Sequence, residues 1–196
     1  MNARAKLRLL LSLRVLPRRV ARFYWRASRQ ALRDDDRFSI ASAARPAELA
    51  QLLSLARARR VVVELGTGTA WSAIALALDD DARRIVSYDP SVRVERDAYL
   101  ALAGSDARAR IELRAEPDSI GPHDGDAPVE LLFIDSEHER EPVLAAFAAW
   151  REALEPAAVV VFHDYAHPQY PGVREAVGEL GLSGEDVGGV FVWRAP

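Results

Sequence analysis

Short runs of valine, isoleucine and leucine alternate along this chain with longer stretches in which apolar residues recur every three or four positions. The short runs predict buried strands, and the longer period predicts amphipathic helices. We expect strands at 61–65, 84–89, 110–114, 129–135 and 157–164, helices at 46–58, 69–79, 92–103, 139–153 and 173–181, and short closing strands at 184–187 and 190–194. This alternation predicts an α/β fold. Its doubly wound, mostly parallel seven-stranded sheet would have an antiparallel C-terminal strand and helices on both faces.

Residues 1–45 follow a different pattern and are predicted to form a basic helical arm ahead of one domain at 46–196. Residues 1–33 carry ten Lys or Arg and no acidic residue, and Pro17 divides this stretch into two short amphipathic helices. The other 163 residues carry 16 basic and 29 acidic side chains, a net charge of -13. We therefore expect the arm to pack on the acidic domain or on the second subunit of a homodimer, with an anionic membrane surface as the alternative partner. The acidic remainder offers no extended basic surface, so a nucleic-acid partner is not expected.

The amino-acid composition excludes several kinds of bond and catalytic group. The chain has no cysteine, which excludes disulfides, thiolate catalysis and cysteine-ligated metal centres, and Lys6 is its only lysine, which excludes a lysine base within the domain. The apolar runs are shorter than the roughly 20 residues that cross a bilayer. We expect a cytoplasmic protein, peripheral to a membrane if the arm binds lipid.

A glycine-containing turn joins the first strand of the domain to the helix after it. Gly66 and Gly68 let the chain turn sharply and let a ligand approach the main chain, at the sheet edge where open parallel sheets bind ligands. A dinucleotide-binding turn has a third glycine where this chain has Trp71, which disfavours NAD. The second strand ends at Asp89, where one carboxylate accepts hydrogen bonds from both hydroxyls of a ribose. The predicted cofactor contacts here are Glu64, Leu65, Gly66, Thr67, Gly68, Asp89 and Pro90.

A second group of polar residues ends the fourth and fifth strands. Asp135 ends the fourth strand, and His163 and Asp164 end the fifth, so all three are expected at the same sheet edge. They are the predicted ligands of a divalent cation, Mg²⁺ or Mn²⁺, which would lower the pKa of a substrate hydroxyl. His138, three residues after Asp135, is the predicted general base, and Asp135 is assigned to catalysis with it. The alternatives are that His138 caps the following helix and that His163 is a buried, hydrogen-bonded histidine.

The motifs resemble those of a known enzyme family. E-x-G-x-G at 64–68 resembles motif I of the class I S-adenosylmethionine-dependent methyltransferases, and the run LLFIDSEHE, followed by FHD and PGV, resembles their small catechol-type and macrocin-type O-methyltransferases and the cephalosporin hydroxylase-like group. The resemblance implies a Rossmann-like fold and S-adenosylmethionine as the cofactor. It also implies that Asp135 contacts the cofactor and that the loop after the third strand lies near adenine, where Glu116 is the predicted contact and Asp118 and Ser119 are alternatives. A solvated turn explains these three residues equally well.

This chain departs from the family pattern at several positions. Ser136 replaces a glycine, Ala157 and Ala158 replace a glycine pair, His163 and Asp164 stand where the catechol type has Asp and Asn, and His138 stands where lysine is often the base. These departures leave metal dependence open.

The predicted function is methyl transfer from S-adenosylmethionine to a hydroxyl of a small molecule. Two other classes compete with it: a non-catalytic methyltransferase-like scaffold tethered by the basic arm, and a nucleotide-dependent oxidoreductase, which the missing third glycine disfavours.

Overall fold

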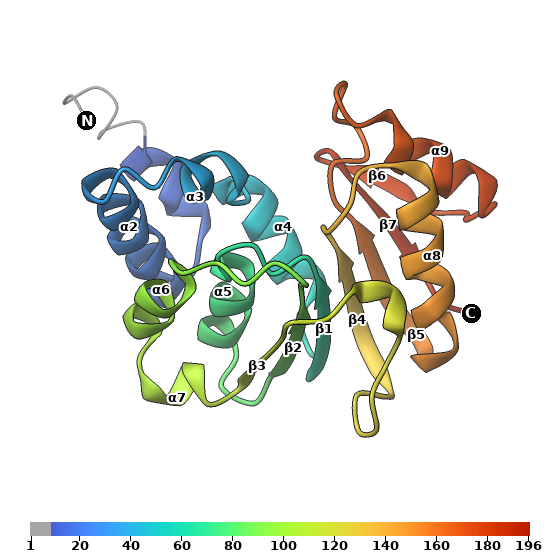
Figure 1. The fold of residues 1–196 in the computed structure, drawn as a ribbon, viewed down its shortest axis with the longest axis horizontal. Helices are drawn as coiled ribbons and strands as arrows, with labels where there is room; N and C mark the ends of the chain where they lie inside the picture. Colours follow the sequence, from blue (N-terminus) through green and yellow to red (C-terminus); the bar gives the residue numbers. More distant parts are fainter. Residues whose placement is uncertain (1–8) are drawn as a thin grey trace.

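A computed structural model describes residues 9–196, which form a seven-stranded sheet covered by helices on both faces (Figure 1). The strand order is β3-β2-β1-β4-β5-β7-β6. The bounds are β1 Val61–Leu65, β2 Arg84–Tyr88, β3 Ile111–Arg114, β4 Val129–Ile134, β5 Leu154–Phe162, β6 Glu185–Val187 and β7 Val190–Arg194. The first five strands are parallel, and β7 is antiparallel to both β5 and β6. The predicted doubly wound, mostly parallel sheet with a reversed C-terminal strand is confirmed.

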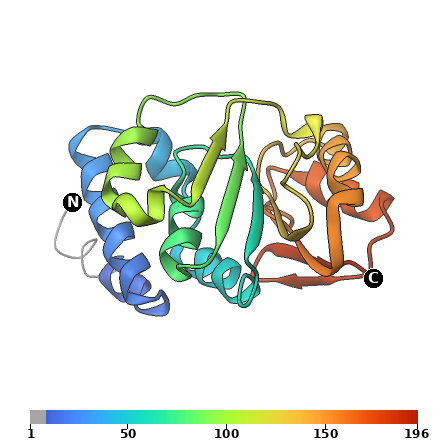
Figure 2. The ribbon, with the colours of Figure 1, turned by 90° about the horizontal axis from the view of Figure 1, so that it is seen from below.

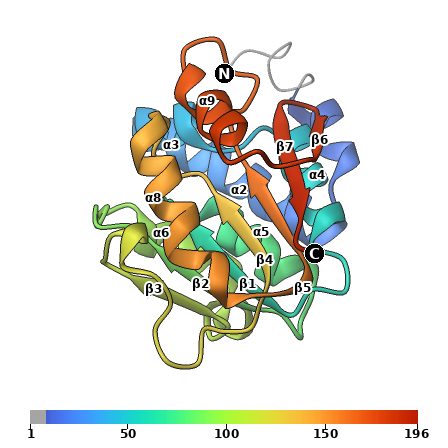
Figure 3. The same ribbon diagram turned by 90° about the vertical axis from the view of Figure 1, so that its right-hand side faces the viewer.

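The two faces of the sheet have separate cores. On one face, Val62, Ile85 and Leu131 pack under α4 Pro46–Leu55, α5 Trp71–Asp79, α6 Arg96–Ala103 and α7 Ser105–Arg108. On the other, Val63 and Leu132 pack under α8 Arg140–Trp150 and α9 Pro171–Glu179, with the short 3₁₀ turns η2 Asp118–Ile120 and η3 Arg151–Ala153. Figure 3 looks at the sheet from this second face, with α8 and α9 on the viewer's side of the strands. Successive residues of a strand point to opposite faces, which is why the central strands read as unbroken apolar runs.

The basic arm forms a third layer outside α5. It comprises a helical turn at residues 9–12, the 3₁₀ turn η1 Leu13–Val15, α2 Arg18–Arg33 and α3 Arg37–Ser42. Phe23 and Tyr24 of α2 meet the Trp71 ring edge to face, at centroid distances of 6.0 and 5.2 Å. Arg19 binds both carboxylate oxygens of Asp81 at 2.8 and 2.9 Å. Figure 2 shows α2 lying along the outer flank of the molecule, against its own chain.

The element boundaries differ from the sequence predictions at two informative places. Helix α3 was not predicted. It begins because the Asp36 carboxylate accepts a 2.9 Å hydrogen bond from the Ser39 amide, so the acidic residues 34–36, which follow the end of α2, also start the next helix. Strand β5 begins at Leu154 rather than at 157, because a register shift against β4 absorbs the extra residues. Ala157 lies within this irregular stretch at φ 62°, a conformation that favours the glycine it replaces.

No helix in the described part of the chain is long and apolar enough to cross a membrane.

Candidate active site

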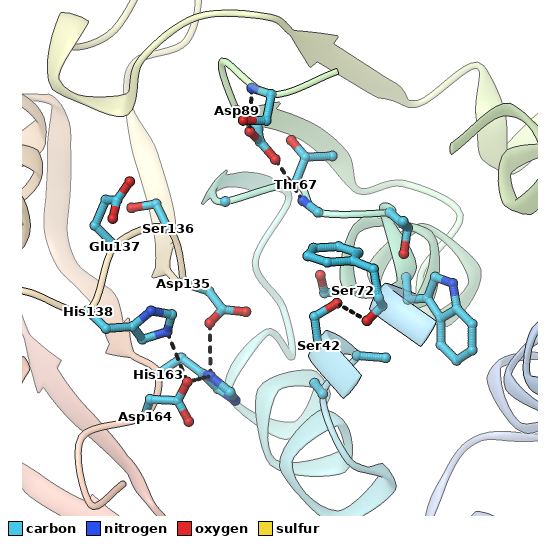
Figure 4. Close-up of a pocket in the computed structure, with 18 of the residues that line it drawn as sticks. Ser42, Thr67, Ser72, Asp89, Asp135, Ser136, Glu137, His138, His163 and Asp164 are labelled. Atoms are coloured by element: carbon cyan, nitrogen blue, oxygen red, sulfur yellow. Dashed lines mark hydrogen bonds and ion pairs between the residues drawn. The ribbon is translucent and has the colours of Figure 1, made fainter. Parts of the chain in front are cut away.

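A cavity of about 710 Å³ opens at the carboxyl edge of the sheet, where β1 and β4 lie side by side. The chain runs from β1 to one side and from β4 to the other, and an open parallel sheet binds its ligands at such a point. The volume falls within the usual range for cofactor and substrate pockets. Figure 4 shows Thr67 and Asp89 on one side of this cavity and Asp135, His138, His163 and Asp164 on the other.

The glycine turn after β1 is shaped by its contact with β4. A Cβ atom on Gly66 would lie 2.3 Å from the carbonyl oxygen of Asp135, and the residue has φ 100°, so only glycine fits. Gly68 also has a positive φ, 50°, but the nearest atom to a Cβ there is 3.8 Å away, on the Phe38 ring. Gly66 is therefore required for the close approach of the turn to the end of β4, whereas Gly68 leaves the turn open to the cavity.

Glu64 lies beneath this turn and is completely buried. The Ser87 hydroxyl donates to its Oε2, while its Oε1 has no hydrogen-bond partner among the described residues. Burial, with the nearby charge of Asp135, raises the pKa of Glu64 to about 7. Leu65 is also buried and packs into the core under α8. Neither side chain lines the cavity, although both were predicted cofactor contacts.

Asp89, at the end of β2, is held by three donors. The Gly68 amide donates to Oδ2 at 2.9 Å, Arg96 Nη2 donates to the same oxygen at 2.7 Å, and the Ser91 amide donates to Oδ1 at 2.7 Å. A carboxylate has about four acceptor positions, so Oδ1 keeps capacity for a further donor. Asp89 and Pro90 both line the cavity. A cofactor ribose suits this arrangement, because its hydroxyl would meet a fixed carboxylate.

Arg96, on α6, is a functional candidate that the sequence reading missed. Its side chain is buried, and besides Asp89 it donates to the carbonyl oxygens of Gly68 and Ser91, both at 2.6 Å. It therefore joins the glycine turn to the end of β2 and fixes the distance between them. The position of Arg96 within a predicted helix does not indicate these contacts, because its partners lie on two separate loops.

The loop after β3 presents a different residue from the one predicted. Glu116 pairs with His123 Nε2 at 2.7 Å on the surface and does not line the cavity, whereas Asp118 does. The Ser136 hydroxyl donates to the Asp118 carboxylate, and Trp150 Nε1 donates to the Asp118 carbonyl at 2.7 Å. Of the three residues considered in this loop, Asp118 is the one positioned to meet a ligand.

Charged groups cluster at the ends of β4 and β5. His163 Nδ1 lies 2.9 Å from Asp135 Oδ1 and 3.3 Å from Asp164 Oδ2, and its Nε2 lies 3.8 Å from Glu48 Oε2. Burial opposes a charge on this imidazole, but the three surrounding carboxylates outweigh burial and raise the pKa of His163 to about 12. The surrounding carboxylates therefore favour the protonated imidazole, whose charge offsets theirs.

His138 lies beside this cluster in a stack of rings. Its Nε2 is 3.0 Å from Asp164 Oδ2, and that carboxylate raises the pKa of His138 while burial opposes it. Its ring stacks on Tyr170 at 4.2 Å, and Tyr170 stacks on His167 at 4.6 Å. Asp164 has φ 54°, a backbone strain of the kind that concentrates at functional sites. The stack and the ion pair restrict the position of the His138 imidazole.

Two of the cluster nitrogens are close to carboxylates without bonding them well. His138 Nε2 and His163 Nδ1 are buried and have no aligned hydrogen-bond partner, although each lies at ion-pair distance from an oxygen. Asp135, His138 and Asp164 bring one ligand atom each within 4.8 Å of one another, a donor set that fits a divalent cation. The structure thus brings the predicted ligands Asp135, His163 and Asp164 together, and it places His138 within the group whose ligand atoms meet.

The arm supplies one wall of the cavity. Phe38 and Ser42 of α3, with Arg45 and Glu48 around the start of α4, line the opening. The Ser39 hydroxyl donates to Thr69 Oγ1 at 2.8 Å, which ties α3 to the glycine turn. The sequence indicates the arm before residue 46 as a place where substrate would be selected, but its pattern of leucine and arginine did not single out these residues.

The cavity gathers nine of the twelve predicted site residues and leaves out Glu64, Leu65 and Glu116. The nine are Gly66, Thr67, Gly68, Asp89, Pro90, Asp135, His138, His163 and Asp164.

A family model described as a methyltransferase domain matches residues 63–165, from β1 to just after β5. The chain belongs to this methyltransferase family. The match includes the glycine turn, Asp89, Asp135, His138 and Asp164, so the methyltransferase domain covers most of the site described above. The resemblance inferred from the motifs is confirmed.

Solved structures share the fold of this methyltransferase. The O-methyltransferase TomG from Streptomyces achromogenes, in complex with SAM, is 21% identical with a TM-score of 0.67, over 92% of this chain and 91% of that one. An O-methyltransferase from Bacillus cereus in complex with SAH is 17% identical with a TM-score of 0.63, over 80% and 84% of the two chains. Cofactor-bound Rv0187 from MTB is 21% identical with a TM-score of 0.67, over 85% and 89%. No curated protein matches the chain.

Proposed function

We propose that this methyltransferase transfers the methyl group of S-adenosylmethionine to a hydroxyl oxygen of a small molecule. The observation that carries the proposal is the pairing, in one cavity, of a carboxylate held for a ribose, Asp89, with a histidine and carboxylate pair, His138 and Asp164. The likeness in fold to O-methyltransferases that bind SAM or SAH supports it.

The cofactor supplies an electrophilic methyl group on a sulfonium sulfur. Asp89, fixed by Arg96 and the glycine turn, would hold the ribose, and Asp118 lies where the rest of the adenosyl group would extend. The acceptor would enter beside Tyr170 and the wall formed by α3. Catalysis then rests on alignment, because the oxygen must approach the methyl carbon opposite the departing sulfur.

His138 is proposed as the general base. As the new C–O bond forms and the C–S bond breaks, the hydroxyl proton passes to the ring nitrogen of His138 that is not paired with Asp164. Asp164 orients the imidazole and stabilises the imidazolium that results. Asp135, paired with His163, would face the cofactor and the acceptor together.

A divalent cation is the second candidate for activating the hydroxyl, favoured by the compact donor set of Asp135, His138 and Asp164. Mg²⁺ or Mn²⁺ held there would lower the pKa of a bound hydroxyl. The contacts of His163 Nδ1 with Asp135 and Asp164, at 2.9 and 3.3 Å, favour the base mechanism over this one, because both carboxylates already have a partner there.

The test is methyl transfer from isotopically labelled S-adenosylmethionine to a panel of hydroxylated small molecules, followed by mass spectrometry. We expect a methylated product that forms equally well after treatment with a chelator, and whose formation His138→Ala slows about a thousandfold. Activity that is lost on chelation and restored by Mn²⁺ would overturn the base mechanism in favour of the metal. Reduction of a nicotinamide cofactor in place of methylation would overturn the function itself.

A further inference from the structure

Helix α2 has one face in the core and the opposite face in solvent. Val20, Phe23, Ala27 and Ala31 are buried against the domain. Arg18, Arg22 and Arg29 follow at spacings of four and seven residues, which places them together on the side of the helix opposite those buried residues. Figures 1 and 2 show this helix on the outer flank, on the far side of the molecule from α8 and α9.

The three outward arginines lack partners in the part of the chain that the structure describes. Arg19 binds Asp81, and Arg33 binds its neighbour Asp34, but no hydrogen bond or ion pair of residues 9–196 involves the side chains of Arg18, Arg22 or Arg29. The positive charge on this surface is therefore not compensated locally, in a domain whose remaining residues are strongly acidic.

Exposed apolar side chains occur in the same segment of the arm as these arginines. Leu10, Leu11 and Val15, in the turns just before α2, are 48%, 46% and 57% exposed, and Leu32 near the end of α2 is 46% exposed. The buried Leu13 and Leu16 of this segment face inward, so the exposed residues face away from the domain. Arginine combined with exposed leucine suits an interface that has both negative charge and an apolar interior.

We propose that this outer surface of the arm, formed by Leu10, Leu11, Val15, Arg18, Arg22 and Arg29, docks the enzyme on an anionic membrane. A second copy of the chain is a poorer occupant, because a two-fold interface would set these arginines against each other. Nucleic acid would meet the arginines but would leave the leucines facing a polar groove. Lipid phosphates and acyl chains match both kinds of side chain.

The experiment is sedimentation of the full chain with vesicles of phosphatidylglycerol and phosphatidylcholine in equal parts, and with vesicles of phosphatidylcholine alone. We expect binding to the first and not to the second, weakened at high salt because the contact is electrostatic. Equal binding to both vesicles, or binding to neither at low salt, would overturn the proposal.

Two variants with the same change in charge identify the surface. Replacing Arg18, Arg22 and Arg29 by glutamine should weaken binding about fivefold for each arginine, or about a hundredfold together. Replacing the exposed Arg57, Arg151 and Arg194 by glutamine should leave binding unchanged. An equal loss in both variants would show attraction by net charge alone and would contradict the proposal.

Two further measurements test the apolar contacts and the rival occupants. Leu11→Ser with Val15→Ser should reduce the binding that survives at high salt, and unchanged binding would remove these side chains from the interface. In sedimentation velocity without vesicles, a dimer that dissociates in the Arg18, Arg22 and Arg29 variant would identify a second copy as the occupant and overturn the proposal. Tighter binding to duplex DNA than to the anionic vesicles would overturn it in favour of nucleic acid.

Discussion

At the β1 and β2 end of the cavity, Asp89 and Arg96 meet their partners through aligned hydrogen bonds of 2.6 to 2.9 Å. At the β4 and β5 end, His138 Nε2 and His163 Nδ1 lie near carboxylates without such alignment, and Asp164 has a strained backbone. At the first end these bonds fix the residues that line the cavity, since the unpartnered Glu64 Oε1 belongs to a side chain outside the lining, and this suits a group that binds without changing. The second retains unmatched polar atoms, which suits a reacting group that completes the contacts.

The largest expected difference between the two ends of the cavity is the effect of replacing His138. His138→Ala should lower kcat about a thousandfold, because general base catalysis contributes on that scale, while the affinity for S-adenosylhomocysteine should stay within twofold. Steady-state kinetics and calorimetry measure the two effects. A similar loss of kcat and of affinity for S-adenosylhomocysteine would place His138 in cofactor binding. It would contradict the assignment of binding to one end of the cavity and of reaction to the other.

The glycine turn offers a matched pair of substitutions. Gly66→Ala should cost about 4 kcal/mol of the free energy of unfolding, because its Cβ would clash with the main chain of Asp135. Gly68→Ala, with open space around its Cβ, should cost about 1 kcal/mol. Urea unfolding measures both, and equal costs would contradict the assignment of the first glycine to packing.

Glu64 makes the buried floor of this end sensitive to pH. Its folded pKa is raised, so the folded state binds more protons than the unfolded state between pH 4.5 and 7, and stability falls as the pH rises through that window. Glu64→Gln lacks this loss. As the pH rises from 4.5 to 8, the free energy of unfolding of this variant should therefore increase relative to that of the parent protein by about 3 kcal/mol. Urea unfolding at each pH measures this difference. Parallel pH profiles of the two proteins would show that Glu64 is ionised normally.

Arg96 should act on cofactor affinity alone. Arg96→Lys keeps the charge but loses the fork that joins Gly68, Asp89 and Ser91, and we expect the Kd for S-adenosylhomocysteine to rise about tenfold with kcat within twofold. Arg110, which donates to the Ala77 and Asp80 carbonyls away from the cavity, provides the control. If Arg110→Lys weakens the cofactor equally, Arg96 serves only general stability.

The spacing of apolar residues and the position of turn residues predicted the sheet, because buried strands and amphipathic helices each have a characteristic local sequence pattern. Asp89, Asp135 and Asp164 could be placed at one edge because parallel strands end together. The partners of these residues could not be predicted. Arg96 reaches two loops from a helix, and Phe38 and Ser42 come from the unpredicted α3. Glu48, which lies near His163 Nε2 and helps Asp135 and Asp164 to raise the pKa of that imidazole, precedes it by more than a hundred residues. Such contacts depend on tertiary packing, which leaves no local signature.

Calorimetric titration of the protein with S-adenosylhomocysteine tests the central claim most directly. A single saturable site is expected, at least tenfold weaker in Asp89→Asn, with no binding of NAD. A folded protein that fails to bind S-adenosylhomocysteine, or that binds NAD instead, would contradict the account.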